Sequence, residues 1–424
     1  MMKKTLAVGA AAVAVSLTLA GCASGPDTQN VKTDFGVTAS TITLGAISDT
    51  SNIYKASAPS IVAGNEIYFA DRNKNNKICG REVVIDVKDH ASDSAKAATL
   101  YSQMQPNILG LVQLLGSPQQ AALAKQITSD GVTTMLAGWS SAMLPTAKDP
   151  NLKYYVLAGT TYPLDTINGM QWLMDSGKIA KGDTVGYIYA TGAFGGDAYN
   201  GGKFFAEKAG VTLAQKEVAP NATDLTAQVA DIKSKNPKAI VVSGGPAILA
   251  GTVSALKAAG LNIPVLANSP AYDAKFTAAA NPAAAYFSSN VFLTTSLLPT
   301  SDANTDGLKK VQTLFTEAQK SGKYPATVVN DQQLNYGYAL ASIMGQALDA
   351  ACKSGDMTRA GVNAAVATLS KVVTGVTPDL DYTNRQKSPS TASYILQPDA
   401  AALGGSKLVK NVGTTEIAKQ FQNQ

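Results

Sequence analysis

From residue 41 onward, short runs rich in β-branched and apolar residues alternate with longer segments of helical periodicity. Strand, helix and strand in that order predict parallel sheets joined by right-handed crossovers. The sequence therefore predicts an α/β fold with a long helix over residues 334–352. The expected strands are 41–47, 83–87, 108–115, 132–137, 184–190, 239–243, 263–267 and, as the last one, 391–397.

The composition limits the classes of function that this chain can have. The chain has 424 residues, of which 45% are hydrophobic and 15% charged, so it can bury a large core and divide into two or three lobes. Its formal charge is +5, or +3 if Lys3 and Lys4 are removed with a leader segment. No cluster of basic residues is long enough to bind along a nucleic-acid backbone. His90 is the only histidine, so the chain lacks the histidines of a histidine-rich metal site and has a single candidate for the base of a catalytic triad. We expect no enzyme, no metal and no cofactor.

The N-terminal segment is organised like an export signal. Two lysines precede an apolar run over 6–19, and Leu19-Ala20-Gly21-Cys22 follows directly. This segment resembles a bacterial lipoprotein signal peptide, which implies removal of residues 1–21 and a lipid on Cys22. An uncleaved anchor helix is the alternative. Residues 22–37 are predicted to be a flexible tether. We therefore expect an extracytoplasmic body held at a membrane by its lipid.

The other two cysteines are Cys79 and Cys352. Export would place this even pair in an oxidising compartment, where a disulfide forms readily. Two independent buried thiols are the alternative, because the sequence does not give the distance between them.

Two loops follow predicted strands at the edge where open parallel sheets bind ligands. In the first, Gly116 precedes Ser117, which is expected to be the N-cap of the next helix, with a proline at the first helical position. In the second, Trp139 precedes Ser140 and Ser141. Hydroxyls, free amides and a helix dipole suit a small anion such as a carboxylate. The alternative is that these serines serve only as caps and turn residues.

In its order of motifs, the mature chain resembles the type I periplasmic binding proteins, specifically the branched-chain amino acid receptors of ABC transporters. The residues that carry the resemblance are Ile42-Thr43-Leu44-Gly45, Ile78-Cys79-Gly80-Arg81, Leu115-Gly116-Ser117, Met135 to Ser141, Gly192 to Asp197, Val242-Ser243-Gly244-Gly245 and Ala258-Ala259-Gly260-Leu261.

The resemblance implies two Rossmann-like lobes with the ligand in the cleft between them. Lobe 1 is expected over 38–160 and 297–376, and lobe 2 over 161–296 and 377–424. Three hinge crossings are expected near 159–163, 293–298 and 374–379.

The resemblance also assigns a pocket. Gly116 or Ser117, with Ser140 and Ser141, would bind a ligand carboxylate. Aromatic walls would come from Tyr54 and Phe194 on opposite lobes, and Trp139 adds a third aromatic side chain.

One position departs from the family pattern. Where amino-acid-binding members carry a carboxylate for the ligand's ammonium group, this chain has Ser269. An ammonium buried without a counter-charge is costly, so either Asp273 reaches the ligand or the ligand has no ammonium group. Carboxylates, amides and urea-like compounds are therefore candidates beside the branched-chain amino acids.

Two other motifs fail on inspection. Residues 71–82 imitate a calcium loop but carry only two carboxylates, and residues 197–204 lack the first glycine and the final hydroxyl of a phosphate loop. We interpret the first as a solvated connection between a helix and a strand.

These observations predict a lipid-anchored, monomeric receptor. It would capture a small polar organic solute and deliver it to an ABC permease driven by a cytoplasmic ATPase. Two alternatives stay open: a sensor of the same fold, and an exported hydrolase using Ser117, Ser140 or Ser141.

Overall fold

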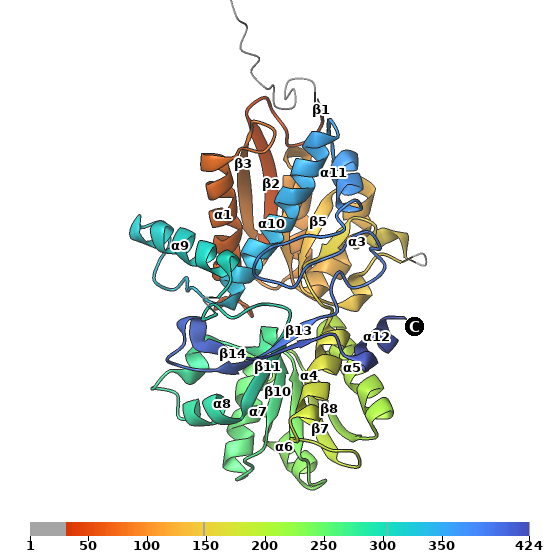
Figure 1. Ribbon diagram of the computed structural model, residues 1–424, viewed down its shortest axis with the longest axis vertical. Helices are drawn as coiled ribbons and strands as arrows, with labels where there is room; N and C mark the ends of the chain where they lie inside the picture. The colour runs from red at the N-terminus through yellow and green to blue at the C-terminus, as the bar shows by residue number, and fades with distance from the viewer. Residues whose placement is uncertain (1–30, 147–148, 303, 424) are drawn as a thin grey trace, which may run out of the picture.

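In the computed structural model, residues 31–146, 149–302 and 304–423 are described, and they form two lobes, one above the other in Figure 1. Each lobe is built on a sheet whose strands are mostly parallel. Cys22 and the leader segment lie outside the described residues. Among the described helices, none has the length and apolar character needed to span a bilayer.

The sheet of lobe 1 has five parallel strands in the order β3-β2-β4-β5-β6. Both faces are covered by helices, and every residue of β4 and β5 is buried, which explains why these strands are almost continuously apolar in sequence. The strands are β2 Thr41–Ser48, β3 Glu82–Asp89, β4 Gly110–Leu115, β5 Thr133–Ala137 and β6 Tyr155–Leu157. The helices of this lobe are α1 Ala58–Asn75, α2 Ser94–Met104, α3 Ser117–Asp130, α9 Asp306–Lys320, α10 Gln332–Lys353 and α11 Arg359–Val366.

Lobe 2 has a seven-stranded sheet in the order β14-β13-β11-β10-β9-β7-β8, in which β13 runs antiparallel to both of its neighbours, β11 and β14. The strands are β7 Thr184–Ala190, β8 Thr212–Val218, β9 Ala239–Ser243, β10 Val265–Asn268, β11 Val291–Thr295, β13 Ser393–Pro398 and β14 Ser406–Gly413. The helices are α4 Tyr162–Asp175, α5 Ala193–Ala209, α6 Thr226–Lys233, α7 Pro246–Ala258, α8 Ala284–Asn290 and α12 Glu416–Gln422.

The predicted strands all form, but the prediction that 391–397 is the last strand is wrong, because β14 pairs with β13 after it. The prediction also missed β6, β8 and β11 as strands. In β14 most side chains are at least partly exposed, so it lacks the apolar run that marks a central strand.

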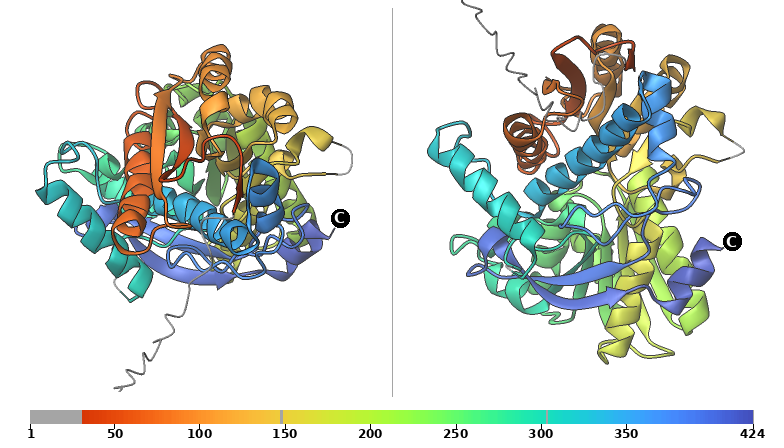
Figure 2. Two further views of the ribbon diagram at one scale, coloured as in Figure 1. Left: turned by 90° about the horizontal axis from the view of Figure 1, so that it is seen from above. Right: turned by 45° about the horizontal axis from the view of Figure 1, so that its top comes forward.

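Helix α10 forms the centre of lobe 1. It packs against α1 and runs toward the junction of the lobes (Figure 2). The two helices approach closely at glycines: a Cβ on Gly337 would lie 1.8 Å from the carbonyl oxygen of Ile61, and one on Gly64 would lie 2.2 Å from that of Leu334. Backbones can meet at this distance only where the side chain is a hydrogen atom.

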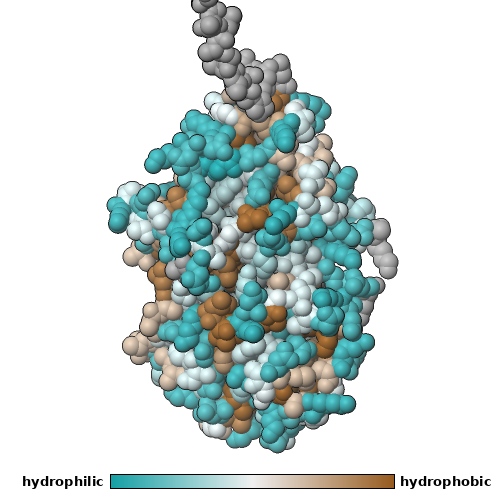
Figure 3. Space-filling model, in the orientation of Figure 1, coloured by the Kyte–Doolittle hydropathy of each residue, from teal (hydrophilic) through white to brown (hydrophobic). Residues whose placement is uncertain are grey.

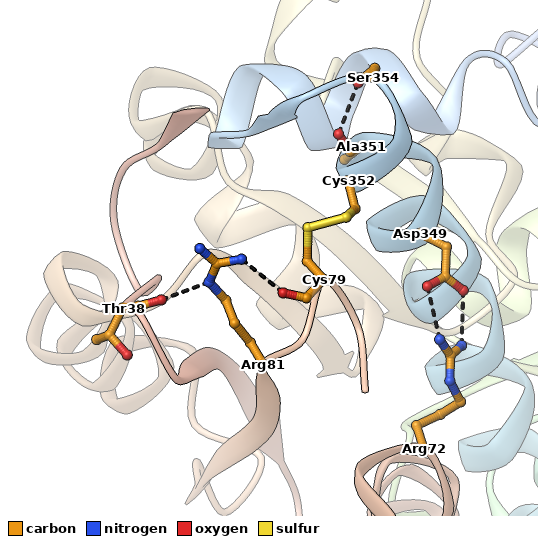
Figure 4. Close-up of a disulfide and its surroundings, with 8 residues drawn as sticks. All are labelled: Thr38, Arg72, Cys79, Arg81, Asp349, Ala351, Cys352 and Ser354. Carbon is orange, nitrogen blue, oxygen red and sulfur yellow. Dashed lines mark hydrogen bonds and ion pairs between the residues drawn. A yellow bond between two sulfur atoms is a disulfide. The ribbon is translucent and has the colours of Figure 1, made fainter. Parts of the chain in front are cut away.

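A disulfide fixes the far end of α10. Cys79, in the loop before β3, bonds to Cys352 with a Cα–Cα distance of 5.7 Å (Figure 4). Nearby, the guanidinium of Arg72 on α1 makes two hydrogen bonds, of 2.9 and 2.8 Å, to the carboxylate of Asp349 on α10. The loop, α1 and α10 are thus joined covalently and by a bidentate ion pair.

Residues 32–33, within the segment predicted as a tether, form a strand. This strand, β1 Lys32–Thr33, pairs with β12, Asp356–Met357, and the amide of Lys32 also donates to the carbonyl of Gly355. This end of the described chain lies at the top of lobe 1 in Figure 1, far from lobe 2.

The chain passes from lobe 1 to lobe 2 between β6 and α4, and it returns to lobe 1 between β11 and α9. Farther along, Tyr382 and Arg385 contact lobe 1, because the Tyr382 hydroxyl donates to the Leu157 carbonyl and Arg385 donates to that of Tyr155. The chain joins the sheet of lobe 2 again at β13, which begins at Ser393 and pairs with β11.

The surface facing the viewer in Figure 3 is mainly polar, with apolar side chains interspersed. The apolar side chains of both lobes are otherwise concentrated around the sheets and α10. Each lobe thus has an apolar interior beneath a mainly polar surface.

Candidate functional site

A cavity of about 140 Å³ lies between the lobes, at the carboxyl ends of strands from both sheets. This is the edge at which open α/β sheets bind ligands. The residues from lobe 1 are Asp49, Ile53, Tyr54, Ser57, Ile61, His90, Ser92, Leu115, Gly116, Ser117, Pro118, Gln119, Ala137, Gly138, Trp139, Gln333 and Tyr336. Those from lobe 2 are Tyr162, Ala190, Thr191, Gly192, Ala193, Phe194, Pro220, Gly245 and Pro270.

Stacked aromatic rings form one wall of the cavity. Trp139 stacks on Tyr336 with centroids 4.1 Å apart, and Tyr162 packs on Phe194 at 4.3 Å across the lobe boundary from them. Hydrogen bonds fix the lobe 1 pair: the Trp139 indole donates to the Ala158 carbonyl, and the Tyr336 hydroxyl donates to Leu136 and accepts from the Gly138 amide. The wall is therefore rigid on the lobe 1 side.

The amino end of α3 points its free amides at the cavity. The structure corrects the predicted cap: Gly116, not Ser117, is the N-cap, and no side chain caps the helix. Gly116 has φ of 98°, a conformation that a glycine adopts without strain. Ser117 is thereby moved into the first turn, where its hydroxyl has no hydrogen-bond partner among the described residues. This end of the helix can accept an anion.

Two polar residues on the lobe 1 side of the cavity, Asp49 and His90, were missed by the sequence analysis as part of the site; we call this part of the lining the floor. Asp49 follows β2, is fully buried, and accepts hydrogen bonds from the amides of Asn52 and Tyr54 and from the Ser92 hydroxyl. Its carboxylate thus holds the loop that carries Tyr54. A polar residue directly after a predicted strand was the available signal for it.

His90 is also on the floor. Its Nε2 lies 2.9 Å from the Leu115 carbonyl and its Nδ1 accepts from the Ser92 amide, so the ring is held as the neutral tautomer with the proton on Nε2. Burial lowers the pKa of this imidazole. With both nitrogens engaged, His90 serves the loop structure and has no free nitrogen with which to accept a proton from a serine.

Of the nine predicted ligand-binding residues, five line the cavity: Tyr54, Gly116, Ser117, Trp139 and Phe194. Four do not. Ser140 donates to the Ala193 carbonyl at 3.4 Å, Ser141 donates to Asp197, Ser269 accepts from Gln332 at 3.1 Å, and Asp273 accepts from the Lys275 amide.

These four residues lie outside the cavity lining for two reasons. The first three make contacts between the lobes, which occupy the hydroxyls that were expected to face a ligand. Asp273 is turned away by its role as the cap of the short helix Ala274–Thr277. In the described arrangement the Asp273 side chain does not line the cavity.

The charge of the lining is uneven. Among the described residues that line the cavity, none is a lysine or an arginine, and none of those from lobe 2 carries a charge. Asp49 is the one carboxylate, and its oxygens already accept three hydrogen bonds. An ammonium group would find no counter-charge on the lobe 2 side.

Comparison with known proteins places the chain. The family model described as periplasmic binding protein matches residues 41–402. A fatty acid ABC transporter substrate-binding protein from Thermomonospora curvata is 33% identical, covers 92% of this chain and 97% of its own, and superposes with a TM-score of 0.85. A comparison with curated proteins finds no match.

Two more distant structures share the fold. A branched-chain amino acid ABC transporter protein from Thermus thermophilus with bound valine is 16% identical over 92% of this chain and 100% of its own, with a TM-score of 0.78. A leucine-binding protein from Thermotoga maritima is 15% identical over 87% of this chain and 98% of its own, with a TM-score of 0.70. The two-lobed architecture, the cavity between the lobes and these matches agree: the chain belongs to the periplasmic binding protein family and has its type I fold.

Proposed function

We propose that this protein captures a small carboxylate with an aliphatic or aromatic body and no ammonium group, and delivers it to an ABC permease. The observation that carries the proposal is the cavity, in which an uncapped helix end meets an aromatic wall and lobe 2 offers no charge. Family membership supports an extracytoplasmic small-molecule receptor. The 33% identical relative, a fatty acid ABC transporter substrate-binding protein, supports the ligand class.

The ligand carboxylate would lie at the amino end of α3. The donors there are the hydroxyl of Ser117 and the backbone amides of Ser117 and Gln119, since Pro118 has no N–H. Charged hydrogen bonds of this kind are stronger than neutral ones. Asp49 repels a second carboxylate, so the floor of the cavity disfavours the head group. The apolar body would pack against Trp139 and Phe194, where each buried CH₂ contributes about 0.8 kcal/mol.

The cavity volume limits the body of the ligand. An apolar cavity of about 150 Å³ holds a molecule the size of benzene. The 140 Å³ here thus fits a short branched chain or one aromatic ring when the lobes are in the described position. A lipid on Cys22 would hold the receptor near its permease, and the three passages between the lobes would serve as hinges.

Calorimetric titration of the mature, unlipidated protein tests the ligand class. The matched ligands are 4-methylpentanoate, its primary amide, and leucine, which adds only the ammonium group. We expect binding of 4-methylpentanoate and at least tenfold weaker binding of leucine, because an unpaired buried ammonium is costly. Preference for leucine over 4-methylpentanoate would overturn the proposal. Preference for the amide would show that the α3 end does not select an anion.

A further inference from the structure

The two lobes are joined across the cleft by a bidentate contact outside the cavity. Ser141, the first residue of the short helix Ser141–Met143 after β5, belongs to lobe 1, and Asp197 belongs to α5 of lobe 2. The Ser141 amide donates to one carboxylate oxygen at 2.6 Å, and the Ser141 hydroxyl donates to the other at 2.5 Å. Neither residue lines the cavity.

The position of this contact links it to the aromatic wall. Ser141 follows Trp139 by two residues, and Asp197 follows Phe194 by three, which is close to one helical turn. Any force that pulls Asp197 toward Ser141 therefore also pulls the first turn of α5 toward the loop that carries Trp139. The contact is therefore coupled to two residues that line the cavity, Trp139 and Phe194, although Ser141 and Asp197 do not line it themselves.

We propose that Ser141 and Asp197 form a latch that holds the cleft closed and sets how long a solute is retained. The two are positioning residues, because they act through the lobes and touch no ligand. The inference rests on the solute-binding function of the cleft, but it does not depend on which solute binds.

The latch includes a titratable group. Closure surrounds the Asp197 carboxylate, and burial raises its pKa to about 6, although the hydrogen bonds from Ser141 act in the opposite direction. The titratable groups that sense its charge are Tyr162 on α4 and Tyr187 on β7, and burial raises the pKa of both hydroxyls. Both tyrosines stay neutral over the acidic range, and among the described residues no lysine or arginine forms an ion pair with Asp197.

The sign of the pH effect follows from linkage. In an open cleft the carboxylate is hydrated and has the ordinary pKa of an aspartate, near 3.8. Because the closed state has the higher pKa, closing takes up a proton between these values, and closure is favoured as the pH falls. The advantage is lost as the pH rises through about 6. Between pH 7.5 and pH 5 the expected gain in affinity from this group is about tenfold.

The test measures release of 4-methylpentanoate by stopped-flow dilution at pH 7.5. Ser141→Ala and Asp197→Ala should release it about tenfold faster, since each removes a charged hydrogen bond, with the association rate little changed. Asp175→Ala on α4 is the control: it is an exposed aspartate of the same lobe and should release like the wild type. Wild-type release rates in both latch variants would overturn the latch.

A second variant separates the latch from a merely structural contact. Asp197→Asn keeps an acceptor for Ser141 but cannot titrate. The affinity of the wild type, divided by that of Asp197→Asn, should rise about tenfold from pH 7.5 to pH 5, and the titration of the ligand cancels in this ratio. A flat ratio would contradict the role of the Asp197 carboxyl.

The latch can also fail or stand independently of the ligand class. If 4-methylpentanoate does not bind, the proposed function loses its ligand, and small-angle scattering of the ligand-free proteins then tests the latch. Ser141→Ala and Asp197→Ala should have a larger radius of gyration than Asp175→Ala. Equal radii in all three variants would overturn the inference.

Discussion

Ser117 is the residue whose position in the cavity most directly links sequence to ligand chemistry. Because Gly116 takes the cap position, the Ser117 hydroxyl is free of the capping role that a serine usually has at a helix start. If Ser117 were itself the cap, its hydroxyl would accept from a backbone amide of the first turn. With Gly116 at the cap position, that hydroxyl lies in the cavity lining without a capping role.

The first prediction concerns this hydroxyl. Ser117→Ala should weaken 4-methylpentanoate binding by about 1.5 kcal/mol, or roughly tenfold, because a hydrogen bond to a charged group is lost. Calorimetric titration measures the change. Ser102→Ala on α2 is the control, because this hydroxyl lies outside the cavity lining, where it donates to the Ala98 carbonyl and accepts from the Gln126 side-chain amide. Unchanged affinity in Ser117→Ala would remove the hydroxyl from the proposed site.

The second prediction concerns the hydroxyl of Tyr336. Tyr336→Phe keeps the ring stacked on Trp139 but leaves the buried amide of Gly138 without its acceptor. The free energy of unfolding should fall by about 1–3 kcal/mol, measured by urea denaturation. Tyr338→Phe is the control, because the Tyr338 hydroxyl has no hydrogen bond to another described residue. Equal stability in the two variants would contradict the bridging role.

At the scale of elements, helix α10 connects the junction of the lobes to the far side of lobe 1. Its amino end contacts Ser269 of lobe 2 through Gln332, and its carboxyl end bears the disulfide. The glycines that let α1 and α10 touch lie between these ends. A displacement of α10 is thus opposed at both ends.

The third prediction concerns the disulfide between Cys79 and Cys352. The bond closes a loop with a sequence separation of 273 residues and thereby limits the unfolded chain. Replacing both cysteines with alanine should lower the free energy of unfolding by about 2–4 kcal/mol. Denaturation of the oxidised wild type, the reduced wild type and the double variant measures it. The reduced wild type should resemble the double variant; stability equal to that of the oxidised form in both would show that the bond adds nothing.

At the scale of the whole molecule, the described lobes are in contact across a small cavity. Contacts between lobes through Ser140, Ser141 and Ser269 indicate a closed arrangement. We expect a ligand to enter this cavity when the lobes separate.

The fourth prediction follows from this arrangement. Saturating 4-methylpentanoate should lower the radius of gyration measured by small-angle scattering, because the ligand binds groups of both lobes and favours the closed state. Leucine at the same concentration is the control and should have a smaller effect. An unchanged radius, at a concentration where calorimetry shows full occupancy, would contradict closure by hinge movement.

The sequence by itself determined the alternation of elements, the parallel sheets and the family, because apolar periodicity and strand-end motifs are local. Strand-end motifs predicted Gly116, Ser117 and Trp139 at the ligand-binding edge of a parallel sheet, and the family resemblance added Tyr54 and Phe194; all five line the cavity. It missed edge strands such as β8 and β14, which are half-exposed and carry no apolar run.

Only the tertiary structure decided which serines face the cavity. Ser140, Ser141 and Ser269 have the same local signature as Ser117, a hydroxyl after a buried strand, but their partners come from the other lobe. Those partners are distant in sequence: Ser141 and Asp197 are separated by 56 residues. A local pattern fixes where a side chain starts, whereas the packing of two lobes fixes what it meets.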